Sequence, residues 1–232
     1  MNGPELQSQV NWKPLPVQWN LDLNENHVFK VAIDRYFSRM GDLYSKTLTA
    51  GEVLKASKYL NQSDQQRYLV SKYLLRDFLG GFLNCAAGDI KFNLSAKKKP
   101  YTQGIEFNVS HTGNYVFLAF SSSPVGIDAE MLNPGFDFEL LLPELFDTEE
   151  IRFINSNAAV RSQLFYMLWT RKEALLKASG EGLTDQLFLV NILSDTPSRI
   201  GQQYQLHSFI QSDCLFTLAL SNHNPCSYWT VL

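Results

Sequence analysis

Residues 105–130 read IEFNVSHTGNYVFLAFSSSPVGIDAE. Within them, three apolar segments have the length and composition of β-strands: residues 105–109, 115–120 and 125–129. The Gly113-Asn114 pair between the first two segments is typical of a hairpin turn. This stretch therefore predicts consecutive strands at the centre of the chain, and helical patterns flank it on both sides.

Two consecutive helices are expected before the strands. Thr49 and Glu52 have the spacing of a capping box, which predicts a helix running to about residue 60. Ser63 and Gln66 repeat this spacing, and an apolar stripe over residues 68–79 predicts a long second helix that stops at the glycines of residues 80–81.

The second half repeats the combination of one long helix with strands. A loop is expected at residues 133–135, and the acidic residues 147–150 are typical of a helix start. A long helix is predicted over residues 158–178, ending near Gly180 and Gly182. The remaining apolar segments predict strands at residues 188–192, 204–210, 215–220 and 228–232.

These elements predict an α+β fold in which helices cover one face of a mostly antiparallel sheet. Because each half contributes strands and a long helix, we expect a pseudo-duplicated architecture with subdomains at residues 1–122 and 123–232. No repeat is visible residue by residue, so the duplication is an expectation about the fold alone.

Composition favours a globular protein of a reducing cytoplasm. The chain has 232 residues, of which 45% are hydrophobic and 19% charged. No stretch approaches the roughly 18 consecutive apolar residues of a membrane helix, and the first twenty residues lack a basic start followed by an apolar run, so neither secretion nor membrane insertion is expected. Its three cysteines are odd in number and far apart, which disfavours a disulfide framework. A pI of about 5.8 without a basic aromatic face makes nucleic-acid binding the least favoured class.

Charge is divided unevenly along the chain. The first 124 residues hold 14 basic and 10 acidic residues, and the remainder holds 6 basic and 13 acidic residues. A basic half suits phosphate binding and an acidic half suits a divalent cation, although ordinary variation in surface charge would give the same numbers.

Two acidic residues end the third strand. Asp128 and Glu130 are two positions apart, so the period of a strand places both carboxylates on one face. Two anions held this closely need a counterion, and an all-oxygen ligand set suits Mg²⁺. A solvated strand end is the alternative for this pair taken alone.

Other charged groups have structural alternatives of the same kind. Glu173 and Lys177 have the spacing of an intrahelical ion pair, which is the favoured interpretation for these two residues alone; the functional alternative is that Glu173 supplies a third oxygen ligand. The lysines at 97–99 are typical of a solvated charge run. His111, beside two hydroxyls at a strand end, could donate to a phosphate, although a lone histidine is more often structural.

Four motifs together resemble the 4′-phosphopantetheinyl transferases of the large, monomeric, surfactin-synthetase-activating type. They are Lys99-Pro100; Asn108-Val109-Ser110-His111; Val125 to Glu130; and Phe165-Tyr166 with Trp169, Lys172-Glu173-Ala174, Lys177 and Gly182-Leu183. The motifs occur in the family's order and spacing, and the resemblance spans residues 48–183.

The resemblance implies a role for each matched position. Asp128, Glu130 and Glu173 would bind Mg²⁺, which would bridge them to the pyrophosphate of coenzyme A, with Asp128, Glu173 and Lys177 at the catalytic centre. Coenzyme A would also contact, through its phosphates and adenine, a set of polar and basic positions: Lys55, Arg67, Lys99, Pro100, Ser110, His111, Lys172 and Lys177. Of these, Lys55, Arg67, Ser110 and His111 would reach the 3′-phosphate, Lys172 and Lys177 would lie near the transferred phosphate, and Lys99-Pro100 would form the adenine-side loop.

Three positions depart from the family pattern. Glu52 occupies a position where some relatives have a basic residue, and Lys98 replaces a glycine that often precedes the lysine-proline pair. These two changes affect the expected nucleotide contacts. Ala129 is smaller than the branched residue common there, but its side chain should point away from the metal face.

The implied reaction transfers phosphopantetheine from coenzyme A to a serine of an apo acyl or peptidyl carrier protein and releases adenosine 3′,5′-bisphosphate. Glu173 is the first candidate for the base, and a water activated by the metal is the alternative. A non-catalytic coenzyme A-binding module of the same fold is the competing function, and another Mg²⁺-dependent nucleotide enzyme, such as a hydrolase, is a third. The apolar segment 133–145 either belongs to the core or exposes a patch for the carrier protein.

Overall fold

The computed structural model describes residues 3–8, 10–182 and 187–231. The chain folds into two compact units, which are described separately below. Unit 1 contains the N-terminal segment up to Val10 and residues 123–223, and unit 2 contains residues 11–122 and the C-terminal segment from Asn224. Each terminal segment thus belongs to the unit built mainly by the other half of the sequence, which no local sequence pattern indicates.

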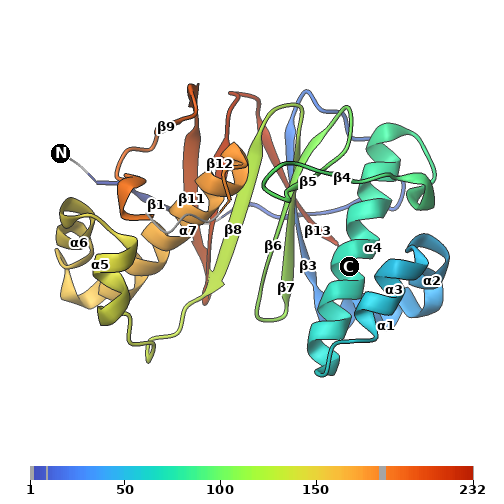
Figure 1. Ribbon diagram of the computed structural model, residues 1–232, viewed down its shortest axis with the longest axis horizontal. Helices are drawn as coiled ribbons and strands as arrows, with labels where there is room; N and C mark the ends of the chain where they lie inside the picture. Colours follow the sequence, from blue (N-terminus) through green and yellow to red (C-terminus); the bar gives the residue numbers. More distant parts are fainter. Residues whose placement is uncertain (1–2, 9, 183–186, 232) are drawn as a thin grey trace. The chain divides into compact units, whose positions relative to one another are not determined.

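Unit 1 is built on a four-stranded sheet in the order β1-β11-β12-β8 (Figure 1). Its first strand is parallel to its neighbour and the other pairings are antiparallel. The longer described elements are β1 (Leu6–Ser8), β8 (Val125–Met131), α5 (Leu142–Leu145), α6 (Thr148–Ile154), α7 (Arg161–Ser179), β11 (Gln205–Gln211) and β12 (Cys214–Leu220). Short 3-10 turns lie at Glu139–Leu141, Ala158–Val160 and Leu187–Leu189, and a small hairpin joins β9 (Ser198–Arg199) to β10 (Gln202–Gln203).

The long helix α7 packs directly on β8 and β12 (Figure 1). Gly126 in β8 makes this close approach sterically accessible, because a Cβ atom there would lie 2.0 Å from the carbonyl oxygen of Ala174 and 2.6 Å from the amide nitrogen of Ala178. Gly180 ends the helix in the left-handed conformation, and its N–H donates to the Leu176 carbonyl. The helix is therefore held against the strand that bears the two acidic residues.

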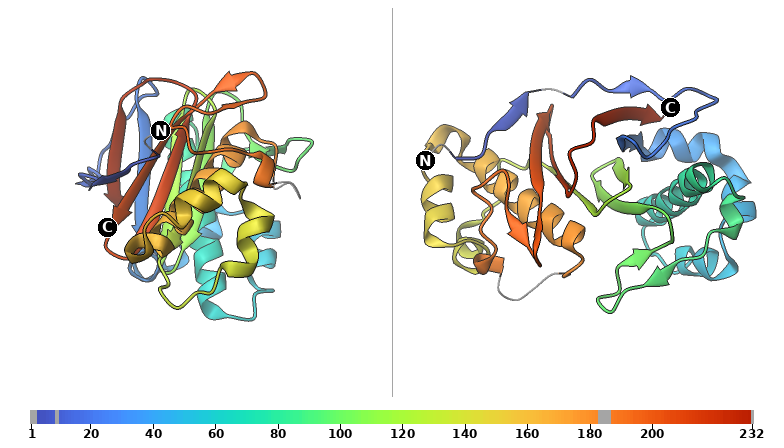
Figure 2. Two further views of the ribbon diagram at one scale, coloured as in Figure 1. Left: turned by 90° about the vertical axis from the view of Figure 1, so that its left-hand side faces the viewer. Right: turned by 90° about the horizontal axis from the view of Figure 1, so that it is seen from above.

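Unit 2 contains a five-stranded sheet in the order β2-β13-β3-β7-β6, with β13 parallel to both of its neighbours. The long helix α4 packs against this sheet through a cluster of stacked and edge-on rings formed by Phe29, Phe78 and Phe120. Helices α1, α2 and α3 surround α4 (Figure 2). The elements are β2 (Lys13–Pro14), β3 (Asn26–Ala32), α1 (Ile33–Met40), α2 (Tyr44–Thr47), α3 (Ala50–Ala56), α4 (Gln62–Leu83), β4 (Asn93–Leu94), β5 (Pro100–Tyr101), β6 (Glu106–Thr112), β7 (Tyr115–Ser121) and β13 (Cys226–Val231), with 3-10 turns at Gly41–Leu43 and Ala87–Asp89.

The α+β prediction is confirmed, since each unit packs one long helix on a sheet. Both sheets are mixed: two of the three strand pairings in unit 1 and two of the four in unit 2 are antiparallel. The capping box of Thr49 and Glu52 forms as predicted, and Asp147 caps α6 through a second one. The strands β7, β8, β11 and β12 lie within two residues of their predicted bounds, and β6 runs three residues further than predicted, to Thr112. The last predicted strand corresponds to β13, and its final residue, 232, lies outside the described residues.

Helix α4 differs from its prediction at both ends. It begins at Gln62 after Asn61, without a side-chain cap, so the Ser63–Gln66 spacing marks no helix start. It also continues through Gly80 and ends only where Asn84 takes the left-handed conformation. Gly80 has a packing role, because a Cβ atom there would lie 2.9 Å from the carbonyl oxygen of Cys85 in the following turn.

The strand predicted at residues 188–192 is wrong. Leu187–Leu189 forms a 3-10 turn, and the carbonyls of Leu187 and Val190 accept hydrogen bonds from a buried lysine, Lys172, in place of a neighbouring strand. Short apolar runs give the same sequence signal for both conformations. Among the described residues, no helix has both the length and the apolar character needed to cross a membrane.

Candidate active site

The acidic residues of β8 face helix α7 in unit 1. The Nζ of Lys177 donates to Oδ1 of Asp128 at 2.6 Å, and the indole Nε1 of Trp169 donates to Oε1 of Glu130 at 3.3 Å. Because Asp128 and Glu130 contact the same helix, the prediction that the strand period places them on one face is confirmed. Glu173 lies four residues, about one helical turn, from both Trp169 and Lys177, so it lies on the same side of α7. We call Asp128, Glu130, Glu173 and Lys177 the acidic row.

Glu173 is the electrostatically perturbed member of this group. Burial raises its pKa to about 7, and the negative charge of Asp128 adds to the increase. The amine of Lys177 opposes the increase, and Glu130 adds to it again. The site therefore concentrates negative charge around a half-buried carboxyl group that exchanges its proton near neutral pH.

The donor chemistry of this row fits Mg²⁺. Asp128, Glu130 and Glu173 offer only oxygen ligands, and their mutual repulsion is the condition that a divalent cation relieves. Among the residues that the structure describes, no three His, Cys, Asp or Glu side chains already stand close enough to form a metal site.

Lys172 lies in the core of unit 1, away from this row. Its side chain is fully buried, and its Nζ donates to Oε2 of Glu150 at 2.7 Å and to the carbonyls of Leu187 at 3.0 Å and Val190 at 2.6 Å. These three acceptors satisfy the hydrogen-bonding capacity of an ammonium group. The phosphate contact that the resemblance implies for Lys172 is thus corrected to a structural role.

Sequence reasoning missed two residues that cooperate with Lys172. Arg171 is fully buried and donates to the carbonyls of Ile192 at 3.0 Å and Ser194 at 2.8 Å, while Glu150 accepts from the Ile192 amide at 3.0 Å. Together they fix the segment that follows α7. The sequence feature that could have indicated these contacts is the adjacent Arg171-Lys172 pair in an otherwise apolar helix, because a cation buried in such a helix needs a partner inside the protein.

Unit 2 contains two cavities between α4 and β6. The larger, of about 540 Å³, is lined in part by Arg67, Tyr68 and His111. The Nζ of Lys55 lies 5.3 Å from the centroid of the Tyr68 ring in its wall. The structure therefore groups three of the residues expected to bind a phosphate: Lys55, Arg67 and His111.

The smaller cavity, of about 180 Å³, is lined in part by Lys99 and Pro100. Ser110 is 6% exposed, and the described lining of neither cavity includes it. As a neighbour of His111 in a strand, it presents its side chain to the opposite face of the sheet. Its predicted contact with the 3′-phosphate stays a prediction, and Lys72, which lines both cavities, was missed.

The two departures in unit 2 have structural explanations. Glu52 caps α3, and its Oε2 accepts from the Nε of Arg76 at 3.0 Å, so its charge is used inside the protein. Lys98 has a φ of 62°, the left-handed conformation that glycine adopts without steric cost. This conformation explains why the family often has a glycine at this position, in the turn before Lys99. Leu183 of the last motif lies outside the described residues.

Comparison with known proteins places this geometry in a family. Residues 124–224 match the family model described as the 4′-phosphopantetheinyl transferase superfamily, and residues 41–123 match the one described as 4′-phosphopantetheinyl transferase, N-terminal. The chain is 32% identical over 183 residues to the 4′-phosphopantetheinyl transferase HetI of Nostoc, covering 75% of this chain and 77% of that protein. It is 34% identical over 129 residues to the transferase gsp of Aneurinibacillus migulanus (54% and 53% covered), and 29% identical over 133 residues to Sfp of Bacillus subtilis (56% and 59% covered).

The chain belongs to the 4′-phosphopantetheinyl transferase superfamily. It is an enzyme of the class that transfers the phosphopantetheine group of coenzyme A to carrier proteins.

Proposed function

We propose that this protein catalyses a Mg²⁺-dependent transfer of 4′-phosphopantetheine from coenzyme A to a serine of an apo acyl or peptidyl carrier protein. The observation that carries the proposal is the row of acidic and basic groups between β8 and α7, in which Lys177 binds Asp128 and burial raises the pKa of Glu173 to about 7. We further propose that the protein acts as a monomer in the cytoplasm.

Asp128, Glu130 and Glu173 would hold the metal ion, since they are the oxygen donors of this row. When bound, Mg²⁺ would neutralise charge on the pyrophosphate of coenzyme A and so favour departure of the nucleotide. Lys177 adds positive charge at the same place: its amine lies 2.6 Å from Asp128 and is only partly buried, so it can also donate to a phosphate oxygen.

The reaction forms a bond between the serine Oγ of the carrier protein and the β-phosphorus of coenzyme A. The bond from that phosphorus to the bridging oxygen breaks, and adenosine 3′,5′-bisphosphate leaves with the bonding electrons. The serine proton passes to the carboxylate of Glu173. In the metal-free protein, burial raises the pKa of Glu173 to about 7, so this carboxyl group is a stronger base than an ordinary carboxylate and is about half ionised at neutral pH. A water molecule is the alternative proton acceptor when Glu173 binds the metal ion.

We propose a division of labour between the two halves of the sequence. Residues 123–232 supply the metal ligands and the catalytic groups, and residues 1–122 supply the nucleotide contacts. The support in unit 2 is the cavity lined by Arg67 and His111, with Lys55 against its wall, which suits the 3′-phosphate. The smaller cavity at Lys99 and Pro100 suits the adenine.

The segment 133–145 offers a surface for the carrier protein. Leu140 is 86% exposed and Phe136 is 40% exposed, whereas Phe138 and Leu142 are buried in the core of unit 1. The sequence left two alternatives for this segment, the core or an exposed patch. Part of the segment belongs to the core, and part of it is an exposed apolar patch. We propose that Leu140 and Phe136 contact the carrier protein beside its reactive serine.

The test is to incubate the protein with coenzyme A, Mg²⁺ and an apo carrier protein, and to follow the mass of the carrier protein. We expect the mass to increase by one phosphopantetheine group, and we expect chelation of the metal or the variant Glu173→Gln to prevent the increase. If a panel of acyl and peptidyl carrier proteins remained unmodified while coenzyme A still bound, the non-catalytic binding module would be the better description.

A further inference from the structure

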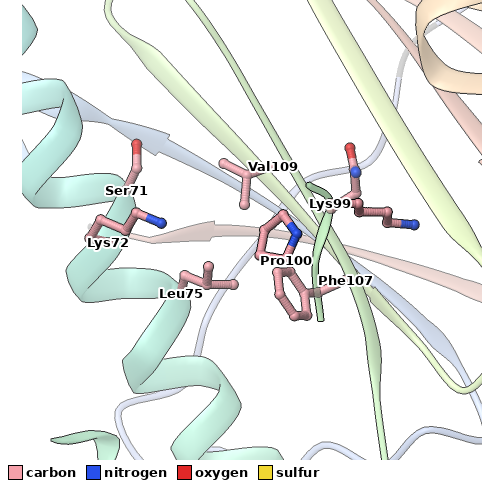
Figure 3. A pocket seen from close by; sticks show the side chains of 8 residues that line it. Ser71, Lys72, Leu75, Lys99, Pro100, Phe107 and Val109 are labelled. Carbon is pink, nitrogen blue, oxygen red and sulfur yellow. The ribbon is translucent and has the colours of Figure 1, made fainter. Parts of the chain in front are cut away.

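Lys72 occupies the wall that the two cavities of unit 2 share. Both cavities are lined by Ser71 and Lys72 of α4 and by Val109 of β6. Figure 3 shows the amine of Lys72 extending from the helix toward Val109 and Pro100, while the amine of Lys99 points away from α4. A ligand that filled both cavities would therefore pass the amine of Lys72.

The surroundings of this amine are aromatic. Its Nζ lies 6.0 Å from the ring centroid of Tyr68 and 5.7 Å from that of Phe92. Burial lowers the pKa of Lys72, and the nearby charges of Lys55 and Arg76 lower it further against the opposing effect of Glu52. The protein thus holds a partly desolvated cation beside other cations, an arrangement that an anionic ligand would stabilise.

Three of the cations around the two cavities have anionic partners. Arg76 donates to Glu52 at 3.0 Å, Arg67 forms an ion pair with Asp64, and Lys99 lies 3.9 Å from Glu106. Lys72 forms no ion pair within the described part of the chain. The carboxylate of Glu52 is hydrogen-bonded to Arg76, so it acts on Lys72 only as a nearby charge and forms no ion pair with it.

The two cavities differ in chemistry on either side of this amine. The smaller one is lined by the apolar side chains of Leu75, Pro100 and Phe107, which suit a flat base. The larger one presents Arg67 and His111, which suit a phosphate. A purine nucleoside that carries a phosphate on its ribose matches this order, with the ribose and its phosphate at the shared wall.

We propose that Lys72 donates to the 3′-phosphate of coenzyme A and so helps the protein to distinguish coenzyme A from its dephospho form. This inference rests on the proposed function. It also accounts for Glu52, which occupies a position where some relatives have a basic residue. Lys72 of α4 would supply the positive charge that is missing at position 52.

The test compares Lys72→Met, which keeps a long apolar side chain, with Lys72→Arg, which keeps the charge. Lys46→Met serves as the matched control, because Lys46 is an exposed lysine on α2 of the same unit and its loss changes the net charge equally. We expect Lys72→Met to raise the KM for coenzyme A about tenfold or more and to leave the KM for dephospho-coenzyme A nearly unchanged. Lys72→Arg should retain most of the discrimination, and Lys46→Met should retain all of it.

A binding measurement separates this inference from the proposed function. Calorimetry with adenosine 3′,5′-bisphosphate and with adenosine 5′-monophosphate requires no turnover, so it tests Lys72 even if the wild-type protein transfers nothing. The wild type should prefer the bisphosphate, and Lys72→Met should lose about tenfold or more of that preference at unchanged thermal stability. An equal loss of affinity for both nucleotides, or an unchanged preference, would overturn the assignment.

Discussion

Replacing Glu173 by glutamine should stabilise the metal-free protein at alkaline pH. The pKa of Glu173 is raised from 4.5 to about 7, first by burial and then by Asp128. The folded state therefore binds a proton more tightly than the unfolded state does, and the stability of the wild type falls as the pH rises from about 4.5 to about 7. Glutamine has no charge to bury, so the variant lacks this loss.

The size of the effect follows from the shift. At about 1.4 kcal/mol per pKa unit, a change from 4.5 to about 7 corresponds to at most about 3.5 kcal/mol in the free energy of unfolding at pH 8. At pH 5 the same group should contribute less than about 1 kcal/mol. For a chain of this size, the larger value corresponds to roughly 7–14 °C in Tm.

Thermal and urea unfolding at pH 5 and pH 8 would measure this difference. Glu144→Gln is the matched control, because it removes the same charge from an exposed site of the same unit. Adding Mg²⁺ at pH 8 should stabilise the wild type more than Glu173→Gln, since the proposed site binds the ion through the ionised carboxylate. If Glu173→Gln and Glu144→Gln gave the same stabilities at both pH values, the electrostatic account of the site would be wrong.

Three further substitutions test the packing and the proposed surfaces. Gly126→Ala should lower stability by about 2 kcal/mol or more and reduce transfer, because its Cβ would meet the backbone of α7 at Ala174. Unfolding and transfer activity are measured at one temperature, and an unchanged value of both would contradict the close packing of Gly126 on α7. Lys172→Met should cost about 3–5 kcal/mol by leaving Glu150 buried without its cation, and adding Glu150→Gln should recover part of that loss in urea unfolding; full stability of the single variant would contradict the buried pair. Leu140→Ser should raise the KM for the carrier protein and leave coenzyme A binding and Tm nearly unchanged, whereas a lower Tm at an unaltered carrier KM would return Leu140 to the core.

Local patterns predicted the elements that depend on nearby residues. The period of the strand was enough to place Asp128 and Glu130 on one face, and the capping box at Thr49 was enough to start α3. The pairing of β1 with β11 and of β13 with β3 was not predicted, because each joins segments separated by about 200 residues. Such pairings are decided by which sheet edge the segment can cover, and its own sequence does not specify that edge.

The charged residues Arg171, Lys172, Glu173 and Lys177 of α7 show why the site was only partly predictable. Eleven of the nineteen residues of α7 are buried, so the helix has interior surroundings on more than one side, and its sequence period does not identify one solvent face. At about 100° per residue, Arg171 and Lys172 point away from the direction of Glu173 and toward the segments at 187–195 and at Glu150. Two buried cations on such a helix are tolerated only with internal acceptors, which the folded chain supplies from backbone carbonyls and from the carboxylates of Glu150 and Asp195. Glu173 and Lys177 share a stripe four residues apart and are both partly exposed, so their charges remain available to a metal ion and a phosphate. The same motif thus contains an anchor and a reactive face, and only the positions of Glu150 and the 187–195 segment, far from the motif in sequence, distinguish the two.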